Sequence, residues 1–168
     1  MKHFILVTMV VLGALCHSMA GSLEAHYTNY NFSITFPEGW LIAKTPPNKL
    51  VVAGVSTNRL MTVAVASFKI QPGDENTALP QMNAGLKNLM SKNGQKVTEG
   101  QKTVGGISFH TFTGTMSLKT TAAAYTTSAG GRLYMIQTSS DADNAGTDPA
   151  IQSIVNSFHL LSAPAKTK

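Results

Sequence analysis

The chain has 168 residues, of which 43% are hydrophobic and 12% are charged, and its formal net charge is +5. This length and composition suit one globular domain and exclude a disordered or fibrous chain. The single cysteine, Cys16, excludes an internal disulfide framework, a Cys-x-x-Cys redox pair and a cysteine-cluster metal site.

The first twenty residues have the pattern of a secretory signal peptide. Lys2 precedes an apolar run from Phe4 to Leu15, and Ser18 and Ala20 place small residues at positions −3 and −1 of a cleavage site after Ala20. The run is too short for a retained transmembrane helix, which needs roughly 20 apolar residues. We therefore expect cleavage near Ala20 and a secreted or periplasmic protein.

Cys16 offers an alternative, in which this cysteine is lipidated and anchors the protein to a membrane. Leu15 directly before it is bulky where a lipobox carries Gly or Ala, which disfavours lipidation. Cleavage after Ala20 removes the cysteine and, because Lys2 is lost, leaves a net charge of +4. The predicted organisation is a signal peptide at 1–20, one domain at 21–161 and a flexible tail at 162–168.

Alternating apolar and polar residues predict consecutive antiparallel strands in the first part of the domain. The first strand runs from Tyr30 to Phe36 and ends at the turn Pro37-Glu38-Gly39. Trp40–Ile42, Leu50–Val55 and Leu60–Ile70 follow as further strands. The residues expected to point inward from the first strand are Tyr30, Phe32, Ile34 and Phe36.

Helical spacing then replaces the alternation, and three more strands follow it. A helix is predicted up to the cap Asn93-Gly94. The strands are predicted at Ile107–Met116, Thr120–Ser128 and Leu133–Ser139, the last two joined by a hairpin turn at Gly130-Gly131. The apolar positions of the helix are Leu79, Met82, Leu86, Leu89 and Met90.

A second helix is predicted near the end of the domain. Asp148 is its expected N-cap and Pro149 its first residue. About six or seven strands with one helix in the middle and one at the end exclude repeated βαβ units. The prediction is an α+β fold in which helices flank an antiparallel sheet. The apolar face of the second helix comprises Ile151, Ile154, Val155 and Phe158.

Two segments resemble the PsbP-like superfamily, including its bacterial DcrB-type members. The segment Tyr27–Trp40, YTNYNFSITFPEGW, resembles the family's opening strand, and Ile151–Phe158, IQSIVNSF, resembles its terminal helix. In the family a last short strand follows, here at His159–Leu161. The resemblance implies an α/β/α sandwich and a non-catalytic role as an extrinsic subunit, assembly helper or binding partner. It also implies that Trp40 fills the core beside the Pro-Gly turn.

The segment from Asp141 to Asp148 has some features of a calcium-binding loop, with aspartates at positions 1 and 3 and Gly146 at position 6. Position 5 is Ala145 and position 12 is Gln152, so one monodentate ligand and the bidentate glutamate are missing. A polar turn that ends in a helix N-cap is the favoured interpretation.

No arrangement of residues in the sequence predicts a catalytic site. There is no Gly-x-Ser-x-Gly motif, and Ser108 and His110, two residues apart on one strand, lie on one sheet face at a separation that is long for a nucleophile and its base. Glu24 and Glu99 each stand without a second acid nearby in the sequence, so no pair of carboxylates can be chosen for acid–base catalysis. The acids that fall in turns are Glu38, Asp74, Glu75, Asp141 and Asp143.

Metal, phosphate and nucleic-acid sites are likewise not predicted. His26, His110 and His159 lack the close spacing of a zinc site, and Gly105-Gly106 and Gly130-Gly131 do not open a helix that could bind phosphate. The basic residues Lys87, Lys92, Lys96 and Lys102 are spread out, unlike those of a nucleic-acid-binding surface. A weak preference for an acidic partner or an anionic envelope surface is the alternative to plain solvation.

The leading hypothesis is an exported, non-catalytic binding or assembly module without a cofactor, engaging a protein or cell-envelope partner. Two alternatives stay open. One is a small envelope hydrolase or metal-dependent enzyme that uses His110. The other is a structural subunit of an extracytoplasmic complex.

Overall fold

The structure is a computed structural model that describes residues 17–18, 21–43, 46, 50–57, 61–92, 96–115, 120–141 and 145–161. The rest of the predicted signal peptide, the predicted tail at 162–168 and the predicted cap Asn93-Gly94 lie outside the described residues. Among the described residues no helix is long and apolar enough to cross a membrane.

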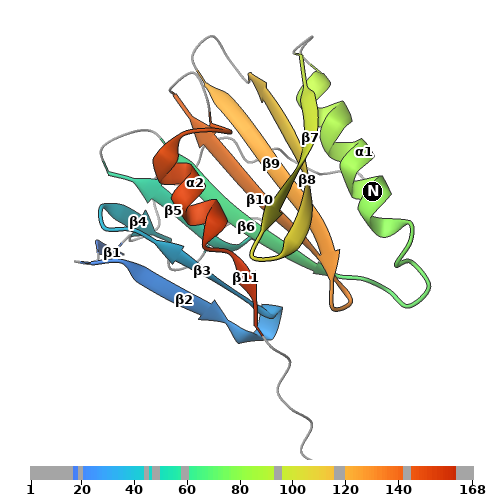
Figure 1. Cartoon of the computed structure of the whole chain (residues 1–168), viewed down its shortest axis with the longest axis horizontal. Helices are drawn as coiled ribbons and strands as arrows, with labels where there is room; N and C mark the ends of the chain where they lie inside the picture. The colour runs from blue at the N-terminus through green and yellow to red at the C-terminus, as the bar shows by residue number, and fades with distance from the viewer. Residues whose placement is uncertain are drawn as a thin grey trace, which may run out of the picture.

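Two antiparallel sheets form the framework of the domain (Figure 1). The larger sheet has the strand order β1 (His17–Ser18), β4 (Trp40–Ile42), β5 (Leu50–Ser56), β6 (Thr62–Lys69), β10 (Arg132–Ser140), β9 (Thr121–Ala129), β8 (Ile107–Thr115) and β7 (Thr98–Val104). The smaller sheet has the order β11 (His159–Leu160), β3 (Phe32–Phe36) and β2 (Leu23–Tyr27).

Three helical segments complete the described fold: the 3-10 helix η1 (Thr28–Tyr30) and the α-helices α1 (Ala78–Ser91) and α2 (Pro149–Asn156). Helix α1 packs on β8 and β9, whereas α2 packs on β3 and β6. The α+β class and the antiparallel sheet flanked by helices are thus confirmed. The three-stranded sheet is an additional feature that the sequence patterns did not predict.

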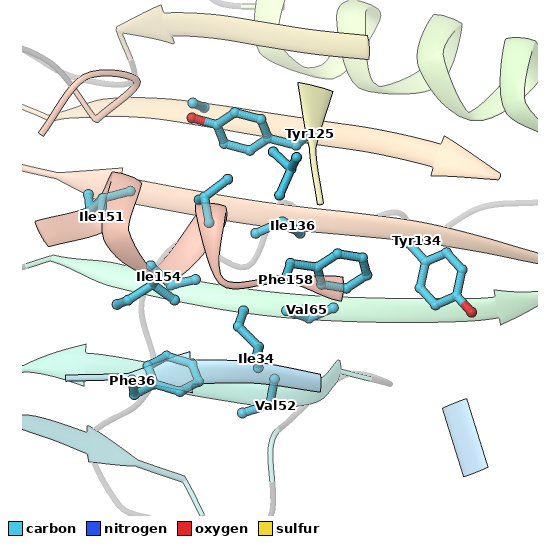
Figure 2. Packing of buried hydrophobic residues seen from close by; sticks show 14 of the residues in the cluster. Ile34, Phe36, Val52, Val65, Tyr125, Tyr134, Ile136, Ile151, Ile154 and Phe158 are labelled. Carbon is cyan, nitrogen blue, oxygen red and sulfur yellow. The ribbon is translucent and has the colours of Figure 1, made fainter. Parts of the chain in front are cut away.

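Alternation along the central strands gives each face of the larger sheet its own core. In β10, Tyr134 and Ile136 face α2 and the smaller sheet, whereas Met135 faces α1. The first core is the larger one, and Figure 2 shows Ile151 of α2 and Ile34 of β3 gathered in it with Ile136. The smaller sheet therefore joins α2 as a second layer over one face.

The predicted role of Trp40 agrees with the structure. Trp40 is 5% exposed and its ring lies 5.9 Å from that of Phe36, in the core beside the turn at Gly39. Gly39 has a φ of 83°, which a residue with a side chain rarely adopts. The hairpin turn at Gly130-Gly131 is confirmed as well, with φ of 56° and 71°, as a type I′ turn requires.

The prediction that Tyr30 begins the first strand and points inward is wrong. Tyr30 ends η1 and is 37% exposed, and β3 begins only at Phe32. Between them Asn31 has a left-handed backbone with a φ of 59°, which interrupts the extended chain. The alternating pattern of apolar residues therefore begins at Tyr30, two residues before the strand itself begins.

Asp148 is confirmed as the N-cap of α2. Its Oδ1 accepts hydrogen bonds from the backbone N–H groups of Ala150, at 2.9 Å, and Ile151, at 3.3 Å. We expect Asp148→Ala to destabilise the protein by about 0.5–2 kcal/mol, measured by urea unfolding. Asp141→Ala, at an exposed position outside the helix, is the matched control, and an equal loss in both variants would contradict this role.

Candidate functional site

The first cluster of polar side chains lies across the three-stranded sheet. The register places His26 of β2 opposite Ser33 of β3, and Ser33 opposite His159 of β11. Glu24, two residues before His26, points to the same face. Its Oε1 lies 3.6 Å from His26 Nε2 and 3.9 Å from His159 Nε2. Glu24 therefore contacts two histidines rather than a second carboxylate.

Ser33 and His159 are within hydrogen-bond distance, as a nucleophile and its base would be. Ser33 Oγ lies 2.8 Å from His159 Nε2, and His159 Nδ1 lies 3.1 Å from the carbonyl oxygen of Ser157. If Nδ1–H donates to that carbonyl, Nε2 accepts a hydrogen bond from the Ser33 hydroxyl. No local pattern predicts this pair, because 126 residues separate its members.

Two features of the cluster oppose acyl-transfer chemistry. Ser33 is 0% exposed, so a substrate carbonyl has no access to its Oγ. Glu24 Oε1 lies 3.5 Å from the same oxygen, and a negative charge there would destabilise the oxyanion that forms on attack. The arrangement instead ties β2, β3 and β11 together through half-exposed polar side chains.

A second cluster joins α1 to the edge of the larger sheet. Glu99 of β7 lies between Lys87 of α1, with its Oε1 2.6 Å from Nζ, and His110 of β8, with its Oε2 3.1 Å from Nε2. The His110 ring also packs on Phe112, at 4.7 Å between centroids. Glu99 therefore contacts a lysine and a histidine. The hydrogen bond from Lys87, followed by the one from His110, holds the pKa of the Glu99 carboxyl below its ordinary value.

This lowered pKa predicts how the stability depends on pH. A carboxyl whose pKa is lower in the folded state stabilises the protein above its unfolded pKa, and this contribution is lost as the pH falls through the folded pKa. We expect Glu99→Gln to lower the melting temperature at pH 7, and we expect this effect to decline as the pH falls from the ordinary glutamate pKa of 4.5 through the lower folded pKa.

Thermal melts of both proteins between pH 3 and pH 7 measure this convergence. Glu38→Gln removes an exposed carboxylate for which no ion pair is described, and it is the matched control. A Glu99→Gln deficit of the same size at every pH would contradict the assignment of the stabilisation to the charge.

A third contact joins the edge strand β7 to α2. Lys102 Nζ donates to the side-chain carbonyl of Gln152, and it lies 5.8 Å from the centre of the Tyr125 ring. The amide nitrogen of Gln152 donates to Tyr125 Oη at 2.9 Å and to the carbonyl of Gly146 at 2.8 Å. Burial lowers the pKa of Lys102 and raises that of Tyr125. Gln152 is thus used to hold α2 on the sheet.

The other residues considered in the sequence do not converge on one site. Ser108 is exposed on β8, where the described partner of His110 is Glu99. Positions 142–144 of the calcium-like segment lie outside the described residues, and Asp148 caps α2. Within the described parts of the chain, no three His, Cys, Asp or Glu side chains are arranged to hold a metal ion.

The sequence matches no protein-family model and no curated protein. Among solved structures, the fold is similar to that of CyanoP, the cyanobacterial PsbP of Synechocystis sp. PCC 6803, with a TM-score of 0.63 and 14% identity over 92% of this chain and 98% of that one.

Two further structures are similar over 84% of this chain. LpqN, described as involved in cell envelope biogenesis of Mycobacterium tuberculosis, is 19% identical over 91% of its chain, with a TM-score of 0.58. The Saccharomyces cerevisiae Ran-binding protein Mog1p is 12% identical over 96% of its chain, with a TM-score of 0.55. The order of the elements, the two sheets and these likenesses agree with the sequence resemblance, and the chain has the PsbP-like fold.

Proposed function

We propose that the protein is an exported, non-catalytic binding or assembly module that engages a protein or cell-envelope partner. The observation that carries this proposal is the state of Ser33, whose hydroxyl is within reach of a histidine but is fully buried beside a carboxylate. The described polar clusters hold elements of the fold to one another. The similarity to a Ran-binding protein and to a protein of envelope biogenesis supports a binding role.

Export is part of the proposal, with removal of residues 1–20. β1 is the described part of this leader, and it contributes the pairs His17–Ile42 and Ser18–Leu41 at one end of the larger sheet. Cleavage would leave β4 at the sheet edge and leave both cores in place. Mass spectrometry of protein recovered from a secreting host tests this, with a mature chain that begins at Gly21 as the expected result. An added lipid mass on Cys16 would contradict it.

Crosslinking of the mature chain in the cell envelope tests the binding role. We expect one or a few specific partners to be captured and the purified chain alone to be monomeric. Gly85→Ala, on the exposed side of α1, is the control variant. It should fold and capture the same partners as the unmodified chain. Recovery of a permanent complex from every extraction would favour the structural-subunit alternative.

His110→Ala tests the enzyme alternative separately. We expect the variant to capture the same partners, with at most a lower melting temperature because the bond to Glu99 is lost. A hydrolytic activity of the purified protein that disappears in His110→Ala and survives in Glu99→Gln would contradict the non-catalytic proposal.

A further inference from the structure

One end of the domain combines an exposed aromatic ring with two adjacent basic side chains. Tyr30 is the one exposed large hydrophobic residue in the described part of the chain. The Arg132 guanidinium carbon lies 5.2 Å from the centre of the Tyr30 ring. Lys69, at the end of β6, is exposed and lies directly opposite Arg132 in the register of β6 and β10. We call these three residues the tip cluster.

The two cations of the tip cluster have no acidic partner among the described residues. The ion pairs described in the structure all involve Glu24 or Glu99, and neither of these acids is paired with Arg132 or Lys69. Like charges directly opposite each other on neighbouring strands destabilise a sheet. The register therefore places two positively charged side chains on neighbouring strands, and a bound anion would offset the repulsion between them.

Arg132 is held in place by contacts that do not use its outer nitrogens. Its Nε donates to Ser67 Oγ at 2.8 Å, and its guanidinium lies over the Tyr30 ring. The backbone at Tyr30 is also held in place, because Tyr134 Oη donates to the Tyr30 carbonyl oxygen at 3.0 Å and Asn31 follows in a left-handed conformation. Such a prearranged guanidinium loses little freedom when it binds a planar or tetrahedral oxyanion through two hydrogen bonds.

We propose that the tip cluster is a binding site for a phosphate group. Two adjacent cations match a group that can carry more than one negative charge, and a phosphate monoester does so near pH 7. Arg132 would bind two of its oxygens, Lys69 would supply the second charge, and the Tyr30 ring would pack against the part of the ligand that carries the phosphate. The phosphate can belong to a lipid headgroup or to a soluble phosphate ester.

The test has two arms, which distinguish these sources. In the first, the mature chain is sedimented with phosphatidylcholine vesicles with and without phosphatidic acid. In the second, thermal melts are recorded in inorganic phosphate and in sodium chloride at the same ionic strength. Binding in either arm supports the site, provided that it depends on Arg132. The vesicle arm also rests on the proposed envelope role. A response to inorganic phosphate without binding to vesicles would support the site and indicate that the phosphate belongs to a soluble ester.

Variants make the test specific. We expect Arg132→Gln to weaken vesicle binding at least tenfold, or to abolish the phosphate-dependent rise in melting temperature. Lys69→Gln should weaken vesicle binding by about fivefold. Arg132→Lys keeps the charge without the two-pronged geometry, so we expect it to weaken binding less than Arg132→Gln does. If Arg132→Gln does not fold, Arg132→Lys replaces it in the test.

Lys92→Gln is the matched control, because it removes one exposed positive charge at the far end of α1 (Figure 1). The variant should bind as the unmodified chain does. Binding in neither arm, or equal losses in Arg132→Gln and Lys92→Gln, would overturn the proposal.

Discussion

Replacing Phe158 with alanine is expected to lower the free energy of unfolding by about 3–5 kcal/mol. Phe158 is 0% exposed and lies two residues after the end of α2, directly before β11. Its ring is 5.2 Å from that of Phe32, 5.6 Å from that of Phe109 and 5.7 Å from that of Tyr134. One side chain thus connects the smaller sheet, two strands of the larger sheet and the end of α2.

The large cost follows from the surroundings of the ring. Its neighbours belong to three different strands whose positions are set by backbone hydrogen bonds, so they cannot close the space that the ring leaves. Urea unfolding measures the loss. Phe158→Leu, which fills part of the space, should cost less than the alanine variant. A loss below about 1 kcal/mol for Phe158→Ala would contradict the view that this ring joins the layers.

The elements that the sequence predicted well carry strong local signals. The second helix has an N-cap, a proline at its first position and one apolar face, and α2 begins and ends close to the predicted residues. The hairpin of β9 and β10 has two glycines at the turn between two patterned strands. In both cases the residues that decide the structure are neighbours in the chain.

The elements that were missed lack such signals. In β7, the residues from Thr98 to Gln101 are exposed, and the strand reads as a polar linker because it pairs on one side only. The strand β2 does alternate apolar and polar residues, but only over the five residues Leu23–Tyr27, and it is identified by its pairing with β3. Edge strands of this kind owe their structure to backbone hydrogen bonds with a neighbour, which a single sequence does not reveal.

The contacts of the polar clusters were missed for a different reason. His159 reaches Glu24 because the chain returns after α2 to the free edge of β3, so that β11 and β2 lie on either side of one strand. No local pattern records this return. The residue types were all visible in the sequence, but their meeting depends on the order of strands in the smaller sheet.

Substitution of Gly54 by alanine is expected to destabilise the protein by about 1–3 kcal/mol, although it adds a single methyl group. Gly54 lies in the middle of β5, paired with Ile42 on one side and Val63 on the other. A Cβ atom there would be 2.5 Å from Cε1 of Phe36 and 3.1 Å from Cδ1 of Ile42. The Phe36 ring is 1% exposed and packs on Trp40, so it cannot move away freely.

Gly85 offers a matched control, because the same change should have the opposite sign there. It lies on the exposed side of α1, and a Cβ atom would meet nothing within 4 Å. Gly85→Ala should therefore stabilise the protein by up to about 1 kcal/mol through helix propensity. Urea unfolding of both variants gives the comparison. Phe36→Leu should recover part of the loss in the Gly54→Ala background, and a Gly54→Ala protein as stable as the unmodified chain would contradict close packing of β3 on β5.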